Sequence, residues 1–264
     1  MTHPNEISAP ASLTPRSLRS KFRLAASWGA ALLVSSVALA ATVKGQIKGH
    51  NQLVNPVWEE ASRPEANRYT WREPSPTVRA EFRTLFGLAP KELCIVGIKK
   101  IAVPPPAVPT LITIGGGRTT PVTIVVAPQT RLRFRNSDPF KHRIYAVGEA
   151  SFSASDMNLA GERDWTAPGP GTYELRDELA PSLRAWVVVK AGVASIGYPD
   201  RSGAFFLTLE PGEYTLETYF AGKPLGKPRD VTVTTTNLDL SSDPFVVAEE
   251  KKPETKADPK PETK

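Results

Sequence analysis

His142 is the residue around which chemistry could be built. Asn136-Ser137-Asp138 precedes it closely, and Asp177 follows on a later stretch of the chain. An imidazole beside carboxylates can bind a metal ion or form a hydrogen-bonded histidine–aspartate pair. We predict the second arrangement, in which His142 lies in a loop and is hydrogen-bonded to Asp138 or Asp177.

Soft metal ligands and nucleophiles are scarce in this chain. Its 264 residues include one cysteine, Cys94, two methionines and three histidines, which excludes both a disulfide framework and a Cys/His zinc cluster within one chain. Cys94 lies in the apolar stretch 92–103, which favours a small buried side chain over a reactive thiol. There is no Gly-x-Ser-x-Gly motif, and the adjacent carboxylates Asp177 and Glu178 would point apart on a strand. The sequence therefore predicts neither enzyme activity nor a cofactor.

The elements that would position these residues are almost all strands. Short stretches of alternating or continuous apolar residues are separated by turn residues at close intervals, which is typical of a β-sandwich or barrel. Gly115-Gly116-Gly117 is predicted to be a hairpin tip, because no phosphate-loop lysine follows it. One short helix is predicted near 77–86. The predicted strands cover 42–49, 92–103, 110–114, 121–127, 130–136, 142–147, 171–177, 184–190, 192–198, 203–209, 212–220 and 229–235.

The two ends of the chain differ in composition from the predicted β region between them. Residues 1–40 carry basic side chains, then an apolar run that ends in Ala38-Leu39-Ala40, which is typical of a signal peptide. Whether the segment is cleaved or kept as an anchor in the inner membrane remains open. Residues 248–264 are lysine, glutamate and proline with little apolar surface, which predicts a disordered charged tail.

The net charge gives no reason to expect a nucleic-acid partner. The formal charge is +6, and part of it belongs to the basic N-terminal segment. Arg131, Arg133 and Arg135 alternate with apolar residues along a predicted strand, so they are expected to lie on the solvent face of a sheet.

Two stretches carry resemblances to known families. Asn136-Ser137-Asp138 with His142, followed by the strand GPGTYELRD, resembles the second half of a cupredoxin, a plastocyanin-like domain. The later stretch GAFFLTLEPGEYTLETYFAGKPLG resembles the end of a carboxypeptidase regulatory-like domain, which is a transthyretin-like β-sandwich. The order of the two resembles periplasmic proteins of the methylamine-utilisation cupredoxin type.

These resemblances imply a mainly β protein with two Greek-key-type β-sandwich units. The cupredoxin-like domain would cover 110–190 and the regulatory-like unit 191–247. Residues 41–109 would supply a first strand, a wrapping segment and the short helix. Whether these belong to the regulatory-like sandwich, split around the cupredoxin-like domain, remains open.

The copper site that the resemblance implies is degenerate in this chain. In the relatives a loop supplies cysteine, histidine and methionine, and its proline and serine fall on Pro181 and Ser182 here. The cysteine, histidine and methionine positions are then Asp177, Ala180 and Leu183, and only His142 matches a copper ligand. A type 1 copper site needs two imidazoles and a thiolate, so no metal is expected here.

The favoured hypothesis is an exported, non-catalytic binding or scaffold protein of the periplasm or cell envelope. Its partner would be an envelope protein or a glycan, and it would touch the membrane only through an uncleaved N-terminal segment. The candidate interaction residues are Tyr69, Trp71 and Arg72. The alternative is a periplasmic copper-binding electron-transfer protein. Partner, pathway and oligomeric state remain open.

Overall fold

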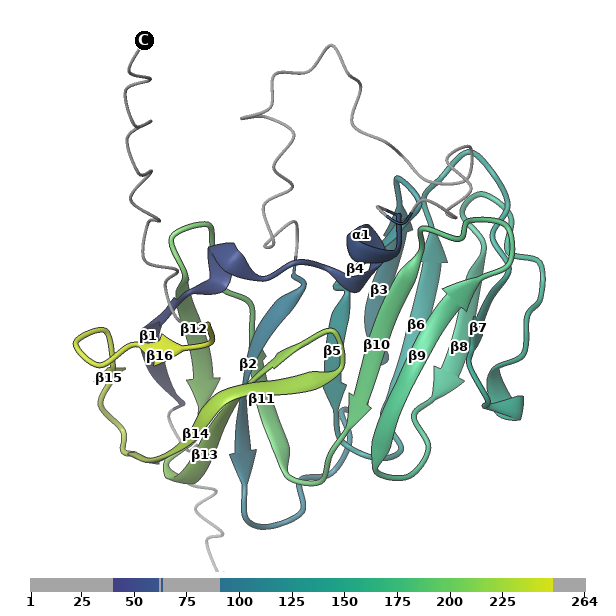
Figure 1. Ribbon diagram of the computed structural model, residues 1–264. Helices are drawn as coiled ribbons and strands as arrows, with labels where there is room; N and C mark the ends of the chain where they lie inside the picture. The colour runs from purple at the N-terminus through teal and green to yellow at the C-terminus, as the bar shows by residue number, and fades with distance from the viewer. Residues whose placement is uncertain (1–39, 62, 64–90, 249–264) are drawn as a thin grey trace, which may run out of the picture. The chain divides into compact units, whose positions relative to one another are not determined.

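The computed structural model describes residues 40–61, 63 and 91–248, which form a mainly β protein (Figure 1). This confirms the predicted fold class. Helical elements are short: α1 (Pro56–Ala61) and the 3₁₀ turns His50–Gln52 and Ala150–Phe152. In this part of the chain, no helix has the length and apolar character that a membrane crossing needs. The predicted helix 77–86, residues 1–39, the tail from 249 and the candidates Tyr69, Trp71 and Arg72 lie outside the described residues.

Residues 110–189 form a sandwich of two four-stranded sheets, which we call the inserted sandwich. Strands β3 and β6 pair in parallel, as do β5 and β10, and the other neighbours are antiparallel. One sheet has the order β4-β3-β6-β8 and comprises β3 (Thr110–Gly115), β4 (Arg118–Thr120), β6 (Arg131–Asn136) and β8 (Glu162–Thr166). The other has the order β5-β10-β9-β7 and comprises β5 (Thr123–Val126), β7 (Ile144–Ala146), β9 (Gly171–Asp177) and β10 (Arg184–Val189).

The core of the inserted sandwich follows from strand alternation. In β6, Leu132 and Phe134 are fully buried while Arg131 is exposed, as the alternation of arginines predicts. Phe152 packs between Phe134 and Trp165, with ring centroids 5.1 Å apart in each pair. These rings contribute the largest apolar surfaces of this core.

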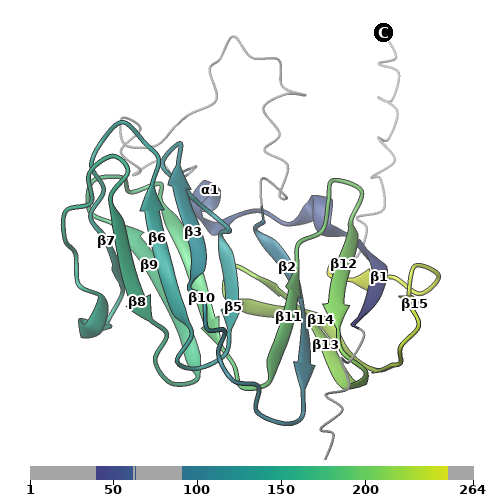
Figure 2. The same cartoon turned by 180° about the vertical axis from the view of Figure 1, so that it is seen from behind.

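A second pair of sheets contains strands from both sides of the inserted segment, and we call it the split sandwich. In Figures 1 and 2, β1, near the start of the chain, runs beside β12 from its last third. One sheet comprises β1 (Ala41–Lys48), β12 (Ala204–Leu209), β15 (Leu238–Asp239) and β16 (Phe245–Val246). The other has the order β11-β2-β13-β14 and comprises β2 (Leu93–Lys99), β11 (Val193–Gly197), β13 (Gly212–Phe220) and β14 (Lys223–Val233). β1 and β2 pair with strands beyond residue 190, so this pair of sheets combines chain segments from both sides of residues 110–189.

An apolar cluster joins the two sandwiches. Cys94 and Val96 of β2 and Tyr219 of β13 pack with Val125 of β5 and Val188 of β10. Cys94 is fully buried, as predicted, and burial raises the pKa of its thiol. The thiol therefore serves as a small apolar side chain at the junction.

Helix α1 attaches to the inserted sandwich. Asn55 precedes it, and its side-chain oxygen accepts a hydrogen bond from the Val57 amide at 2.9 Å, which caps the first turn. Val57 packs with Val122 and Trp186, and Glu60 forms an ion pair with Arg184 of β10. The sequence predicted only a wrapping segment between the first strand and the helix near 77–86, and α1 lies in that segment.

Candidate functional site

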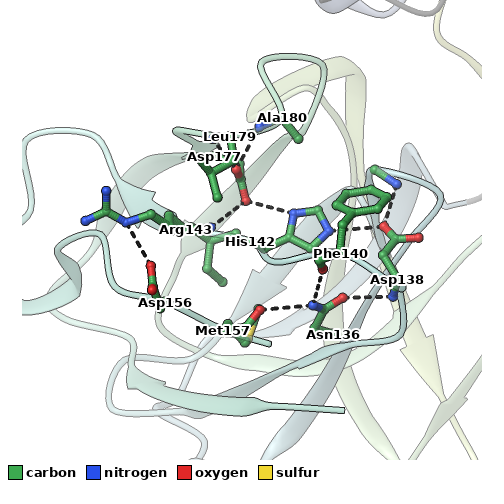
Figure 3. A network of polar contacts seen from close by, with 12 residues as sticks. Asn136, Asp138, Phe140, His142, Arg143, Asp156, Met157, Asp177, Leu179 and Ala180 are labelled. Atoms are coloured by element: carbon green, nitrogen blue, oxygen red, sulfur yellow. Dashed lines mark hydrogen bonds and ion pairs between the residues drawn. The ribbon is translucent and has the colours of Figure 1, made fainter. Parts of the chain in front are cut away.

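His142 lies in the loop between β6 and β7 of the inserted sandwich, completely buried (0% exposed) (Figure 3). Its backbone is fixed by two hydrogen bonds with Met157, at 3.0 Å and 2.9 Å. The ring of Phe140 packs against the imidazole, with centroids 4.9 Å apart. The backbone and the ring of His142 are therefore held in one position even without the polar contacts of its side chain.

Two carboxylates hold the imidazole, one at each ring nitrogen. Nδ1 lies 2.9 Å from Oδ2 of Asp177, and Nε2 lies 3.1 Å from Oδ2 of Asp138. The predicted hydrogen bond to Asp138 or Asp177 is thus confirmed, with both aspartates engaged at once (Figure 3). We call Asp138, His142 and Asp177 the loop clip.

Asp138 connects the clip to the hairpin between β3 and β4. Its two carboxylate oxygens accept hydrogen bonds from the amides of Gly116 (2.6 Å) and Gly117 (2.7 Å). Both glycines have positive φ, 64° and 70°, which is the backbone geometry of the predicted tight hairpin. Burial raises the pKa of Asp138, but the two amides and His142 outweigh burial and hold this pKa below its ordinary value.

Asp177, at the end of β9, connects the clip to the loop that follows this strand. Its Oδ1 accepts hydrogen bonds from the amides of Leu179 (2.6 Å) and Ala180 (2.8 Å), and its Oδ2 accepts one from the Arg143 amide at 3.0 Å. All carboxylate oxygens of the clip thus accept hydrogen bonds from backbone N–H groups.

Asn136 organises the loop that carries His142. Its side-chain NH₂ donates to the backbone oxygens of Phe140 (2.8 Å) and Met157 (3.0 Å), and its Oδ1 accepts from the Asp138 amide at 2.8 Å. The sequence had singled out this asparagine only through its spacing from Asp138. Its structural role is to satisfy three backbone groups of a buried turn.

The residues of this site do not fit the copper ion that the cupredoxin resemblance implies. Leu183 is fully buried in the apolar core and Ala180 packs against that core, so neither offers a donor atom. Both nitrogens of His142 face hard carboxylate oxygens, and Cys94 lies in the junction between the sandwiches. Within residues 40–61 and 91–248, no group of three or more His, Cys, Asp and Glu side chains has the arrangement of a metal site. The donor set lacks the thiolate and second imidazole that type 1 copper needs.

Arg143 forms ion pairs at the surface around the loop clip, a charged rim that the sequence did not predict. Its guanidinium contacts Glu178 at 2.8 Å and Asp156 at 3.2 Å, and all three side chains are substantially exposed. Exposed ion pairs contribute little stability, so this rim mainly sets the surface charge around the buried clip.

No protein-family model matches this sequence, and no curated protein matches it. Among solved structures the chain is similar to a purple cupredoxin from Nitrosopumilus maritimus, with 18% identity, a TM-score of 0.28 and coverage of 31% of this chain and 99% of that one. It is also similar to the reduced form of a mutant amicyanin, with 19% identity, a TM-score of 0.30 and coverage of 38% of this chain and 99% of that one. A copper-containing nitrite reductase from Thermus scotoductus SA-01 matches with 16% identity and a TM-score of 0.29, over 34% of this chain and 25% of that chain.

Proposed function

We propose that this chain is an exported, non-catalytic binding or scaffold protein of the cell envelope whose cupredoxin-like sandwich does not bind copper. The observation that carries the proposal is the loop clip. Both ring nitrogens of a fully buried His142 are engaged by carboxylates, at the position where the resemblance would place a metal ligand.

The clip suits a rigid binding surface better than a reactive centre. A histidine with no solvent access cannot reach a substrate, and its two aspartates are occupied by backbone amides. Phe140 (42% exposed) and Leu179 (54% exposed) lie around the clip (Figure 3). Apolar side chains on loops held by a fixed scaffold are suited to contact with a partner.

The proposal also covers the split sandwich and the location of the protein. The strands β12 and β13 contain the stretch that resembles a carboxypeptidase regulatory-like domain, and we assign the split sandwich to that type. The basic and apolar composition of residues 1–40 supports export. Cell fractionation and N-terminal sequencing of the exported protein test this part, and recovery from the cytosol with an intact N-terminus would contradict it.

Copper reconstitution tests the central part of the proposal. The purified full-length protein is incubated with copper and desalted, and its metal content and visible absorption are measured. A matched variant, D177C/A180H/L183M, restores the donor types of the implied ligand set beside His142. We expect no intense visible absorption and no retained copper in the wild type, and copper with intense absorption in the variant.

The copper content of the wild-type protein decides whether the proposed function holds. Stoichiometric copper that disappears on His142→Ala substitution would revive electron transfer and contradict the proposed function. If the triple variant folds, as judged by circular dichroism, but stays colourless, then the assignment of Asp177, Ala180 and Leu183 to ligand positions is wrong.

A further inference from the structure

The chain between β2 and β3 is an exposed apolar segment, and we call residues 101–109 the proline connector. Its sequence is IAVPPPAVP, which contains no charged or hydrogen-bonding side chain. Residues 104–108 are all exposed, and Val108 (75%) and Ile101 (70%) are the two most exposed large apolar side chains among the described residues. A continuous exposed apolar run of this kind is a liability in a soluble protein unless it contacts a partner.

The backbone of the proline connector is extended and unpaired. Each proline fixes its own φ at about −65° and keeps the residue before it in an extended conformation. Residues 102–106 belong to no helix or strand, and the backbone groups of residues 102–108 form no hydrogen bond within the described part of the chain. These are the properties of a polyproline II helix, which has three residues per turn and no internal hydrogen bonds.

The sides of the proline connector differ in what they face. Val103 and Pro106, which are three residues apart, both line a pocket with walls from β5 and β11, and Pro104 lines it as well. Pro105 is exposed and does not line this pocket. Positions three apart lie on the same side of a polyproline II helix, so Pro105 lies on the side that faces solvent.

A spacer role alone does not account for this composition. The return connection between the sandwiches, residues 190–192, is Lys-Ala-Gly and leads directly from β10 into β11. A spacer needs neither consecutive prolines nor an exposed isoleucine and valine. The apolar side chains of the proline connector therefore indicate recognition by another molecule.

We propose that the proline connector is a docking segment for a partner protein that has a groove lined by aromatic side chains. Proline-rich extended segments dock in such grooves, and they lose little conformational entropy because they are already fixed. The connector leads into β3 at Thr110, whereas the other end of β3 leads into Gly116 and Gly117 at the loop clip. The docking segment is thus separate from the clip and goes beyond the binding role proposed above.

Site-specific photo-crosslinking of the full-length protein in its native cells tests the inference. The photoreactive amino acid p-benzoylphenylalanine replaces Val108 in one variant. In the control it replaces Phe206, an exposed side chain (62%) on β12 of the split sandwich. We expect a defined adduct with another protein at position 108 and none at position 206, and the captured protein is then identified and purified.

The purified partner distinguishes specific docking from incidental contact. Its affinity for the full-length protein is measured by calorimetry, and a synthetic peptide of residues 101–111 should compete for the same site. Pro105→Ser should weaken binding by about tenfold, the loss expected when one anchor residue is removed. Pro228→Ser replaces an exposed proline of β14 and should leave the affinity unchanged. Because both substitutions act alike on the unfolded chain, their thermal midpoints give a matched check of folding.

Three results would overturn the inference. The first is the absence of an adduct specific to position 108, and the second is an adduct with another copy of this chain. The third is a captured protein that binds the wild type and Pro105→Ser equally well. Each result leaves the copper test untouched, so failure of this inference is distinguishable from failure of the proposed function.

Discussion

The loop end of the inserted sandwich and the core of the split sandwich are stabilised by different interactions. The first contains the buried polar residues Asn136, Asp138, His142 and Asp177, which bond to one another and to backbone amides. The second is apolar, and Phe205 and Phe245 meet there edge to face with ring centroids 5.8 Å apart.

This difference indicates what holds each region together. Apolar packing cannot hold these three loops together, because their backbone amides need hydrogen-bond acceptors. The clip provides anionic acceptors for those amides, and the histidine joins the two acceptors. The comparison predicts that charge controls the stability of one region and apolar volume that of the other.

The largest loss of stability is expected for His142→Ala. The substitution removes the imidazole that joins two buried carboxylates and leaves each of them with only its backbone amide donors, so we expect a loss of about 3–5 kcal/mol in the free energy of unfolding. Urea unfolding of the full-length protein measures this loss, and backbone amide exchange shows which loops open.

Phe205→Ala in the split sandwich is the matched control. Phe205 is fully buried, and its truncation should cost about 3–5 kcal/mol through lost packing. The two variants are distinguished by exchange, because His142→Ala should expose the amides of Gly116, Gly117, Leu179 and Ala180 first. Faster exchange of those amides in Phe205→Ala alone would contradict the proposed division between the regions.

Most strands can be predicted from the sequence because their alternation reflects burial on one face. β8 was missed for the same reason, since it is a charged edge strand with Trp165 as its single buried side chain. Helix α1 is too short for a periodic signal, although Asn55-Pro56 is a usable start signal, with a capping residue before a proline. No sequence pattern indicates that β1 pairs with β12, because that pairing depends on tertiary packing.

The candidate site was predicted in its residues but not in its geometry. The spacing identified Asp138, His142 and Asp177, and the ligand comparison identified Ala180 and Leu183. The sequence allowed one hydrogen bond to either aspartate, because it cannot show that two loops meet on opposite sides of one ring. Asn136, Arg143 and Phe140 acquire their roles only from the position of the loops.

A second prediction concerns Glu92, which lies between the two regions. Its Oε1 accepts hydrogen bonds from Asn55 and from Arg118, both at 2.9 Å. Burial raises the pKa of Glu92 to about 7, although Asn55 and Arg118 oppose the rise. The folded state therefore binds the proton more tightly than the unfolded chain does, and this contribution to stability is complete below pH 4.5 and is lost as the pH rises through 7.

We expect the free energy of unfolding to fall by about 2–3 kcal/mol between pH 5 and pH 8 through Glu92. Glu92→Gln keeps an oxygen acceptor and removes the titration, so the difference between wild type and variant isolates the effect. Asp138, whose pKa is held below its ordinary value, titrates in more acidic solution and does not interfere. Parallel pH profiles of the two proteins would contradict the prediction.

The smallest expected effect concerns the charged contact that joins the sandwiches. Lys190, which follows β10, donates to both carboxylate oxygens of Glu217 on β13 at 2.7 Å, beside the apolar cluster of Cys94, Val125 and Tyr219. Because Lys190 is 39% exposed, solvent screens the pair, and we expect Glu217→Gln to cost about 0.5–1 kcal/mol. The difference should shrink further in 1 M salt, where the screening length is about 3 Å. A cost above about 2 kcal/mol that is insensitive to salt would mean that charge, rather than the apolar cluster, holds the two sandwiches together.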